Sequence, residues 1–193
     1  MARIAIIDGH PDPARGRFVN ALADAYETGA VRGGHEVNRI NLSGLEFPIL
    51  RSAAQWAETV PPALKFAQDA IDWADHLVIL YPLWLGAMPA HLKGFLEQIT
   101  CGGFAIAAKE GGRGWSQNLK GKSARIIVTM GMPSQLYRLY FGAHSLKSLE
   151  RNILKFAGVN PVHDTLIGLV EGLSPERRTR ILDRIAKLGE AAR

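Results

Sequence analysis

The chain has 193 residues, of which 47% are hydrophobic and 21% charged, and its formal net charge is +5. This composition is typical of a globular protein, and the length favours a single domain over residues 1–193. The single cysteine excludes an intramolecular disulfide and a Cys-rich zinc site, and it fits a reducing compartment. The N-terminus reaches an acid too soon for a signal peptide, and the longest uncharged apolar stretch, residues 77–90, is too short to span a membrane. We therefore expect a soluble, cytoplasmic protein.

Most of the excess positive charge lies in the second half of the chain, where basic residues cluster between residues 177 and 187. A basic surface suits anionic small molecules, nucleic acids or acidic partners. Apolar residues recur at helical spacing in the same segment, which favours the simpler interpretation of a solvent-facing helix side. Because the chain has no helix-turn-helix, zinc-finger or ribonucleoprotein motif, we expect no nucleic-acid partner.

Strands and helices are predicted to alternate along the chain. Short apolar runs bounded by turn residues predict strands, and apolar residues at helical spacing predict helices. In chain order the predicted elements are a strand at 3–8, a helix at 18–30, a strand at 36–42, an irregular stretch at 43–61, a helix at 62–73, a strand at 76–81, a helix at about 89–99, a long loop with glycines at 102, 103, 111, 112 and 114, a strand at 124–129, a helix at about 143–157, a strand at 162–167 and a last helix opened by Ser174-Pro175-Glu176. Strands this apolar are buried on both faces, which predicts an α/β fold with a five-stranded parallel sheet and helices on both faces.

Ligands of such sheets bind at the carboxyl ends of the strands, which selects the loops 9–18, 82–88 and 129–137. The first loop lacks the glycine fingerprints of dinucleotide and nucleotide-triphosphate sites. It holds His10, Arg15 and Arg17 just before a helix N-terminus, which favours a phosphate cradle over merely solvated arginines.

The second loop places Pro82, Leu83 and Trp84 where polar residues are expected. A flat apolar surface there suits a planar ring ligand, and a core tryptophan is the alternative.

The third loop offers a hydroxyl at Thr129 and a free backbone at Gly131 for the polar edge of such a ring. Tyr137 and His144 follow, and a phenol and an imidazole near a reducible ring can donate protons. Packed, structural side chains are the alternative for both residues. We interpret the remaining histidines outside the first loop as structural.

The chain resembles the flavodoxin-like NAD(P)H dehydrogenases (quinone). The resemblance runs from Ile4 to about Leu188, and its motifs are Gly9-His10-Pro11-Asp12-Pro13, Trp73-Ala74-Asp75-His76, Tyr81-Pro82-Leu83-Trp84, Met88-Pro89-Ala90-His91-Leu92-Lys93-Gly94 and Thr129-Met130-Gly131 with Tyr137. It implies a flavodoxin-like fold with strand order 2-1-3-4-5, a homodimer, and FMN or FAD. It also implies ping-pong hydride transfer from NAD(P)H to the flavin and then to a quinone.

The resemblance also assigns site residues. Those around the flavin phosphate and ribityl chain are His10, Arg17, Phe18 and Asn20. Those lining the isoalloxazine ring are Pro82, Leu83, Trp84 and Leu85, while Thr129 and Gly131 bond its polar edge. Tyr137 matches the family's active-site tyrosine, and His144 lies one place from the matching histidine.

Departures from the family pattern affect the cofactor and the acceptor. The first loop is about two residues longer than usual, with arginine where serine is frequent, and the chain is shorter than the diaphorase type. The short chain favours FMN over FAD. The alternatives that remain are a flavodoxin-type electron carrier, an ancillary subunit of a membrane ion-efflux transporter, and a flavin-dependent azo- or nitroreductase.

Overall fold

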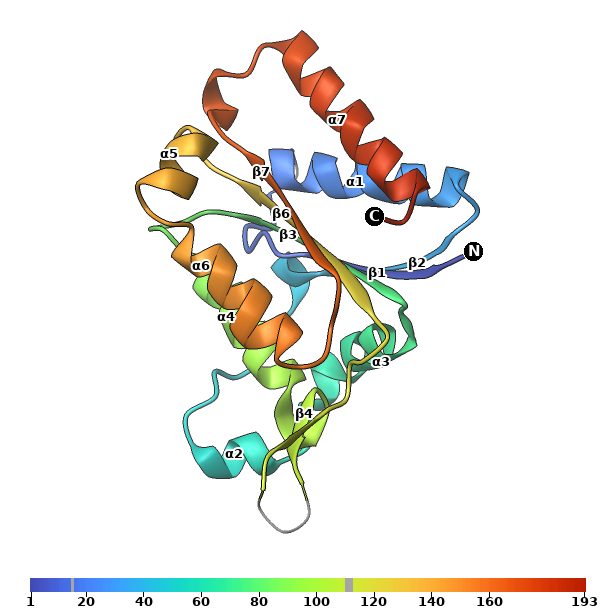
Figure 1. The fold of residues 1–193 in the computed structure, drawn as a ribbon, viewed down its shortest axis with the longest axis vertical. Helices are drawn as coiled ribbons and strands as arrows, with labels where there is room; N and C mark the ends of the chain where they lie inside the picture. The colour runs from blue at the N-terminus through green and yellow to red at the C-terminus, as the bar shows by residue number, and fades with distance from the viewer. Residues whose placement is uncertain (15, 110–112) are drawn as a thin grey trace.

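A twisted parallel sheet lies between two layers of helices in the computed structural model, which describes residues 1–14, 16–109 and 113–193 (Figure 1). Its strands follow the spatial order β2-β1-β3-β6-β7. Their bounds are β1 (Arg3–Asp8), β2 (Glu36–Asn41), β3 (His76–Pro82), β6 (Ser123–Thr129) and β7 (Val162–Ile167). Every neighbouring pair is parallel, so the expected fold and the order 2-1-3-4-5 are confirmed for the five strands of this sheet.

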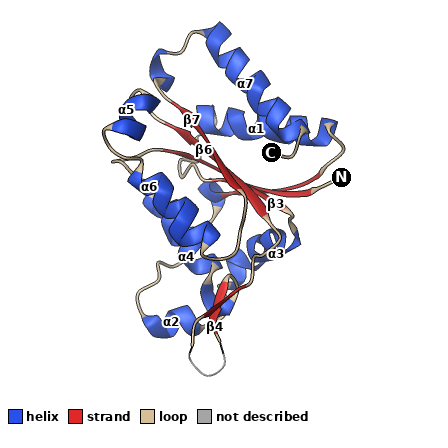
Figure 2. Ribbon diagram, in the orientation of Figure 1, coloured by secondary structure: helices blue, strands red, loops and turns tan. Residues whose placement is uncertain are grey.

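Helices cover both faces of the sheet (Figure 2). One face carries α1 (Phe18–Arg32) and α7 (Pro175–Glu190). The other carries α3 (Lys65–Trp73), α4 (Ala90–Ile99), α6 (His144–Lys147) and the π-helical segment η4 (Ser148–Lys155). Successive residues of a strand point to opposite faces. Ile4 and Ile6 therefore pack under α1 and α7, while Ala5 and Ile7 belong to the core on the other side.

The helices α1 and α7 touch along their backbones. Gly29 of α1 and Gly189 of α7 lie at the crossing, and a Cβ on Gly29 would stand 1.9 Å from the carbonyl oxygen of Ala186. Glycine therefore sets the separation of these helices. At the other end of α7, the Ser174 hydroxyl accepts a hydrogen bond from the Arg177 N–H, which confirms the predicted start of this helix.

Four short elements differ from the sequence-based expectation. A hairpin of β4 (Ile106–Ala108) and β5 (Trp115–Gln117) occupies part of the predicted glycine loop, whose Gly111 and Gly112 lie outside the described residues. A short helix, α2 (Ala53–Ala57), interrupts the stretch predicted as irregular. Another, α5 (Ser134–Leu139), begins within the third predicted loop. Elements of three to six residues show no usable periodicity, and tertiary contacts decide them.

Over the described ranges, no helix is long and apolar enough to cross a membrane. The same residues contain no group of three or more His, Cys, Asp or Glu side chains that could hold a metal ion.

Candidate functional site

The three predicted loops start side by side at the carboxyl edge of the sheet. The Gly9 N–H donates to the Leu80 carbonyl at 2.8 Å, and the Leu83 N–H donates to the Thr129 carbonyl at 2.7 Å. A Cβ at position 9 would stand 2.8 Å from the Leu80 oxygen, so only glycine allows the first loop to leave β1 this close to β3. The ends of β1, β3 and β6 thus form one continuous rim, as expected for a ligand site in a parallel sheet.

An aromatic contact joins the first loop to the second. The rings of His10 and Trp84 lie edge to face with 5.7 Å between their centroids. His10 is buried, and burial lowers the pKa of its imidazole below the ordinary value. Its Nδ1 accepts the Asp12 N–H at 3.1 Å, so the neutral ring carries its proton on Nε2. The lowered pKa favours the neutral ring, and among the residues that the structure describes no hydrogen bond engages its Nε2.

The second loop closes in a tight turn that presents apolar side chains to solvent. Trp84 and Ala87 exchange backbone hydrogen bonds of 2.9 and 3.0 Å around Leu85 and Gly86. Leu85 has φ +47° and is fully exposed, although left-handed backbone is unfavourable for a leucine. Trp84 is 48% exposed, so it is a surface residue and the alternative of a core tryptophan is wrong. Together they present an apolar face beside the rim, where Pro82 is buried and Leu83 half-buried.

The first loop leads directly into α1 through Arg17, the residue that caps this helix. Arg17 is extended and gives no side-chain cap, and the first turn of α1 contains no acid. Its guanidinium pairs with Asp12, whose other oxygen accepts the Ala14 N–H at 2.8 Å. These two bonds, the one from Ala14 first, lower the pKa of the Asp12 carboxyl. Arg15 lies outside the described residues. Uncapped amides beside an arginine are a suitable environment for an anion.

The side chain of Asn20, in the first turn of α1, is hydrogen-bonded to the end of β1. Its Nδ2 donates to Oδ2 of Asp8 at 2.9 Å, and Arg39 of β2 donates to the same oxygen at 2.8 Å. Asp8 is buried, and within the described residues its Oδ1 has no partner. Asn20 and Asp8 line a cleft of about 470 Å³ that extends toward β2. The pair of Asp8 and Arg39 was not predicted from the sequence, although Asp8 stands at the end of a predicted strand beside the first loop.

Thr129 and Gly131, at the start of the third loop, differ in their exposure to solvent. Thr129 is buried at the last position of β6, and Gly131 is exposed. A Cβ on Gly131 would stand 3.6 Å from Oε1 of Glu171, so this carboxylate faces the loop from the short turn η5 (Val170–Gly172). The backbone of Gly131 is thus accessible, while the hydroxyl of Thr129 is enclosed.

Tyr137 and His144 lie in different environments. Tyr137 is 2% exposed, and its hydroxyl oxygen accepts the Leu146 N–H at 3.2 Å. Burial raises the pKa of this phenol, although Leu146 and Ser145 act in the opposite direction as hydrogen-bond donors. His144 is exposed and lies against the backbone of Gly142. The phenol therefore stays protonated inside the fold, and the imidazole remains at the surface.

Two features of the site were missed. Leu139, Tyr140 and Phe141 lie shortly after Tyr137 and expose large apolar surfaces, and three large apolar residues in a row just beyond the predicted loop 129–137 were the signal for them. Arg178 of α7 reaches α1, with its guanidinium carbon 5.2 Å from the centroid of the Phe18 ring. Periodicity alone had placed this arginine on a solvent-facing helix side.

Comparisons with known proteins agree with this architecture. A family model described as a flavodoxin-like fold matches residues 2–190. An uncharacterized NAD(P)H oxidoreductase of Haemophilus influenzae is 28% identical over 96% of this chain and 93% of its own length. An FMN-dependent NADH:quinone oxidoreductase of Bacillus cereus is 28% identical, over 100% of this chain and 99% of its own. The solved structure of an NAD(P)H:quinone oxidoreductase from Methanothermobacter marburgensis has the same fold, with a TM-score of 0.84, 21% identity and coverage of 100% of this chain and 99% of that one.

Proposed function

The chain belongs to the flavodoxin-like family, and on that premise we propose that it is an FMN-dependent NAD(P)H:quinone oxidoreductase. One observation carries the proposal. The exposed apolar turn at Trp84 lies in contact, through His10, with the loop that leads to the uncapped N-terminus of α1. A planar ring with an anionic tail needs these two surfaces next to each other. Full-length relatives described as NAD(P)H and FMN-dependent oxidoreductases support the same assignment.

The residues at the rim fit FMN. Arg17 and the first amides of α1 would hold its phosphate, with Phe18 beside them. Asn20 would contribute indirectly, because its side chain fixes Asp8 at the end of β1.

The apolar surfaces would hold the ring. Leu83, Trp84 and Leu85 would lie along it, with Pro82 behind them, and the Gly131 backbone would face its polar edge. Thr129 is buried at the end of β6 and would fix the start of this loop without contacting the ring.

FMN, when bound, supplies two-electron chemistry, taking hydride from NAD(P)H and reducing a quinone in two alternating half-reactions. The protein's own contribution is orientation and electrostatics. His10 offers an N–H without adding charge, because burial keeps its imidazole neutral. The phenol of Tyr137 keeps its proton at neutral pH and, because its oxygen accepts from Leu146, its O–H remains available to donate. The exposed side chain of His144 would stand at the surface, seven residues after Tyr137 in the chain.

A second copy of the chain would complete the site. Leu139, Tyr140 and Phe141 expose large apolar side chains directly after the helix that carries Tyr137. A single chain leaves this surface in water, whereas a homodimer that covers it would also enclose the acceptor.

The experiment that tests the function is a visible spectrum of the purified protein with added FMN, followed by anaerobic NADPH or NADH and then a simple quinone. We expect a yellow protein that NAD(P)H bleaches and quinone restores. Bound FMN that neither nucleotide bleaches would indicate an electron carrier, and a chain that binds no flavin would favour the ancillary subunit of a transporter.

Two tryptophan variants make this test specific. Trp84→Ala removes the apolar face of the proposed site, and Trp115→Ala removes a comparably exposed tryptophan from the β4–β5 hairpin. Only the first should weaken FMN binding, by about tenfold, because an aromatic contact of this kind contributes about 1–1.5 kcal/mol. Equal weakening in both variants would contradict the proposed position of the ring.

A further inference from the structure

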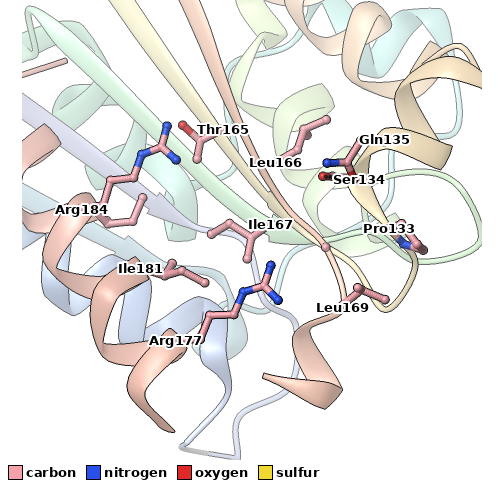
Figure 3. Close-up of a pocket in the computed structure, with 12 residues that line it drawn as sticks. Pro133, Ser134, Gln135, Thr165, Leu166, Ile167, Leu169, Arg177, Ile181 and Arg184 are labelled. Atoms are coloured by element: carbon pink, nitrogen blue, oxygen red, sulfur yellow. Dashed lines mark hydrogen bonds between the residues drawn. The ribbon is translucent and has the colours of Figure 1, made fainter. Parts of the chain in front are cut away.

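A second cleft lies between α7 and the edge strand β7, and its lining includes the end of the third loop at Pro133, Ser134 and Gln135. Its volume is about 210 Å³ (Figure 3). Arg177 and Arg184 project from α7 toward β7, and Ser134 and Gln135 of α5 stand across from them. Sites for drug-sized ligands measure roughly 300–1,000 Å³, so this cleft suits a smaller molecule.

The charge in this cleft is positive and uncompensated. Within the described ranges, neither Arg177 nor Arg184 has an ion-pair or side-chain hydrogen-bond partner. The carboxylate of Asp164, which lines the adjoining end, is already ion-paired with Arg138. By contrast, Arg178 on the same helix donates to the Val170 carbonyl at 3.0 Å.

A third guanidinium lies behind the wall of the cleft. Arg125 of β6 is 8% exposed and donates from Nη1 to the Thr165 hydroxyl at 2.9 Å, and Thr165 itself lines the cleft. Within the described residues, Nε of Arg125 has no partner. Burying a guanidinium without a carboxylate is unfavourable, and a bound anion nearby would relieve part of that penalty.

The floor of the cleft is partly apolar. Ile181 of α7 lies between the two arginines and is partly exposed, while Ile167 and Ile185, which also line the cleft, are buried. A bare inorganic ion would leave this surface in water, whereas a ligand with an apolar body would cover it.

We propose that the cleft between α7 and β7 binds a small organic oxyanion, a phosphate or carboxylate carried on a compact apolar body. The oxyanion contacts Arg177 and Arg184, since planar guanidinium groups match such oxygens in two-point hydrogen bonds. The apolar body lies on Ile181 and its neighbours. Because Ser134 and Gln135 open the helix that carries Tyr137, the ligand also contacts an element of the proposed active site.

Calorimetric titration of the protein in saturating FMN tests this proposal, because the phosphate cradle at α1 is then occupied. The probes are phenyl phosphate, benzoate and inorganic phosphate. We expect one equivalent of phenyl phosphate or benzoate to bind. The tighter of the two identifies the oxyanion, and inorganic phosphate should bind more weakly than phenyl phosphate because it cannot cover the floor.

The variants are the double substitution Arg177→Gln/Arg184→Gln and the control Arg180→Gln. Arg180 lies on the same helix, is exposed and does not line the cleft. The double variant should lose at least about tenfold in affinity and the control less than about twofold. Absence of saturable binding of both organic probes, equal losses in the two variants, or inorganic phosphate binding as tightly as phenyl phosphate would overturn the proposal. The titration reads binding rather than turnover, so its outcome is separable from that of the FMN and NAD(P)H experiment.

Discussion

Replacing Gly29 by alanine should destabilise the protein, although alanine is the better helix former. The new Cβ would stand 1.9 Å from the carbonyl oxygen of Ala186, and real Cβ contacts essentially never fall below 3.0 Å. The helices α1 and α7 must therefore separate by about 1.1 Å at this point. The oxygen belongs to the backbone of α7 and the position of the new Cβ is fixed by the backbone of α1, so no rotamer change can relieve the clash.

The magnitude follows from two opposed effects. Overpacking of this kind costs about 1–3 kcal/mol, and the upper end applies because whole helices must move. The gain from replacing a helical glycine by alanine is about 1 kcal/mol. We expect a net loss of about 2 kcal/mol in the free energy of unfolding, which lowers the melting temperature of a chain this size by roughly 4–8 °C.

Urea denaturation followed by circular dichroism measures the effect. The matched control is Gly44→Ala, since a Cβ at Gly44 meets no atom within 4 Å and its φ is not positive. A second variant, Gly189→Ala, places a Cβ 2.1 Å from the Tyr26 oxygen at the same helix crossing. One separation of the helices relieves both clashes, so the double variant should lose clearly less than the sum of the two single losses. An unchanged or higher stability for Gly29→Ala, or strict additivity in the double variant, would refute this reasoning.

Three further predictions follow from the geometry. Burial lowers the pKa of His76 from 6.5 to about 4, so the folded state binds fewer protons than the unfolded state, and stability is lost as the pH falls below 6.5. Between pH 7.5 and pH 5 this loss is about 2 kcal/mol. The free energy of unfolding of the His76→Asn variant, measured by urea titration, should therefore fall by about 2 kcal/mol less than that of the unmodified protein over the same pH range. Leu85→Gly should raise the free energy of unfolding by up to about 1 kcal/mol in urea titrations, because it relieves left-handed strain at an exposed residue. The same variant should bind FMN more weakly. A drop in stability would contradict this prediction. Tyr137→Phe leaves the Leu146 N–H without its acceptor and should cost about 1–3 kcal/mol in stability. In stopped-flow single turnovers this variant and His144→Ala should reduce FMN more slowly while retaining it, and unchanged rates in both would remove the proposed roles of these side chains.

The sheet could be predicted closely because its inner strands are apolar on both faces. The runs at 3–8, 76–81 and 124–129 are buried at nearly every position, so a parallel sheet is their stable state, whereas the edge strand at 162–167 carries polar, incompletely buried residues at 163–165. The strand at 36–42 ends one residue early in the structure, because Leu42 begins a short 3-10 turn. The spatial order came from the family resemblance, not from periodicity.

The candidate site could be predicted only in part. The three loops were placed by the general rule for parallel sheets, and their mutual contacts confirm that they adjoin. The directions of individual side chains were not predictable, because they depend on partners distant in sequence. Asn20 bonds Asp8 and Tyr137 is enclosed near Leu146, while a sequence pattern gives both only as polar residues near a loop.

The sequence by itself determined the class of fold, the strands and the edge of the sheet where a ligand site is expected, since these depend on local apolar patterns and on general rules of chain connection. The tertiary structure alone decided which charges find partners. Arg178 packs on Phe18, whereas Arg177 and Arg184 on the same helix line the cleft beside β7 and have no ion-pair partner in the described chain. Neighbouring arginines look alike in a sequence. Their roles differ because the rotation of α7 against β7 and α1 sets what each guanidinium can reach.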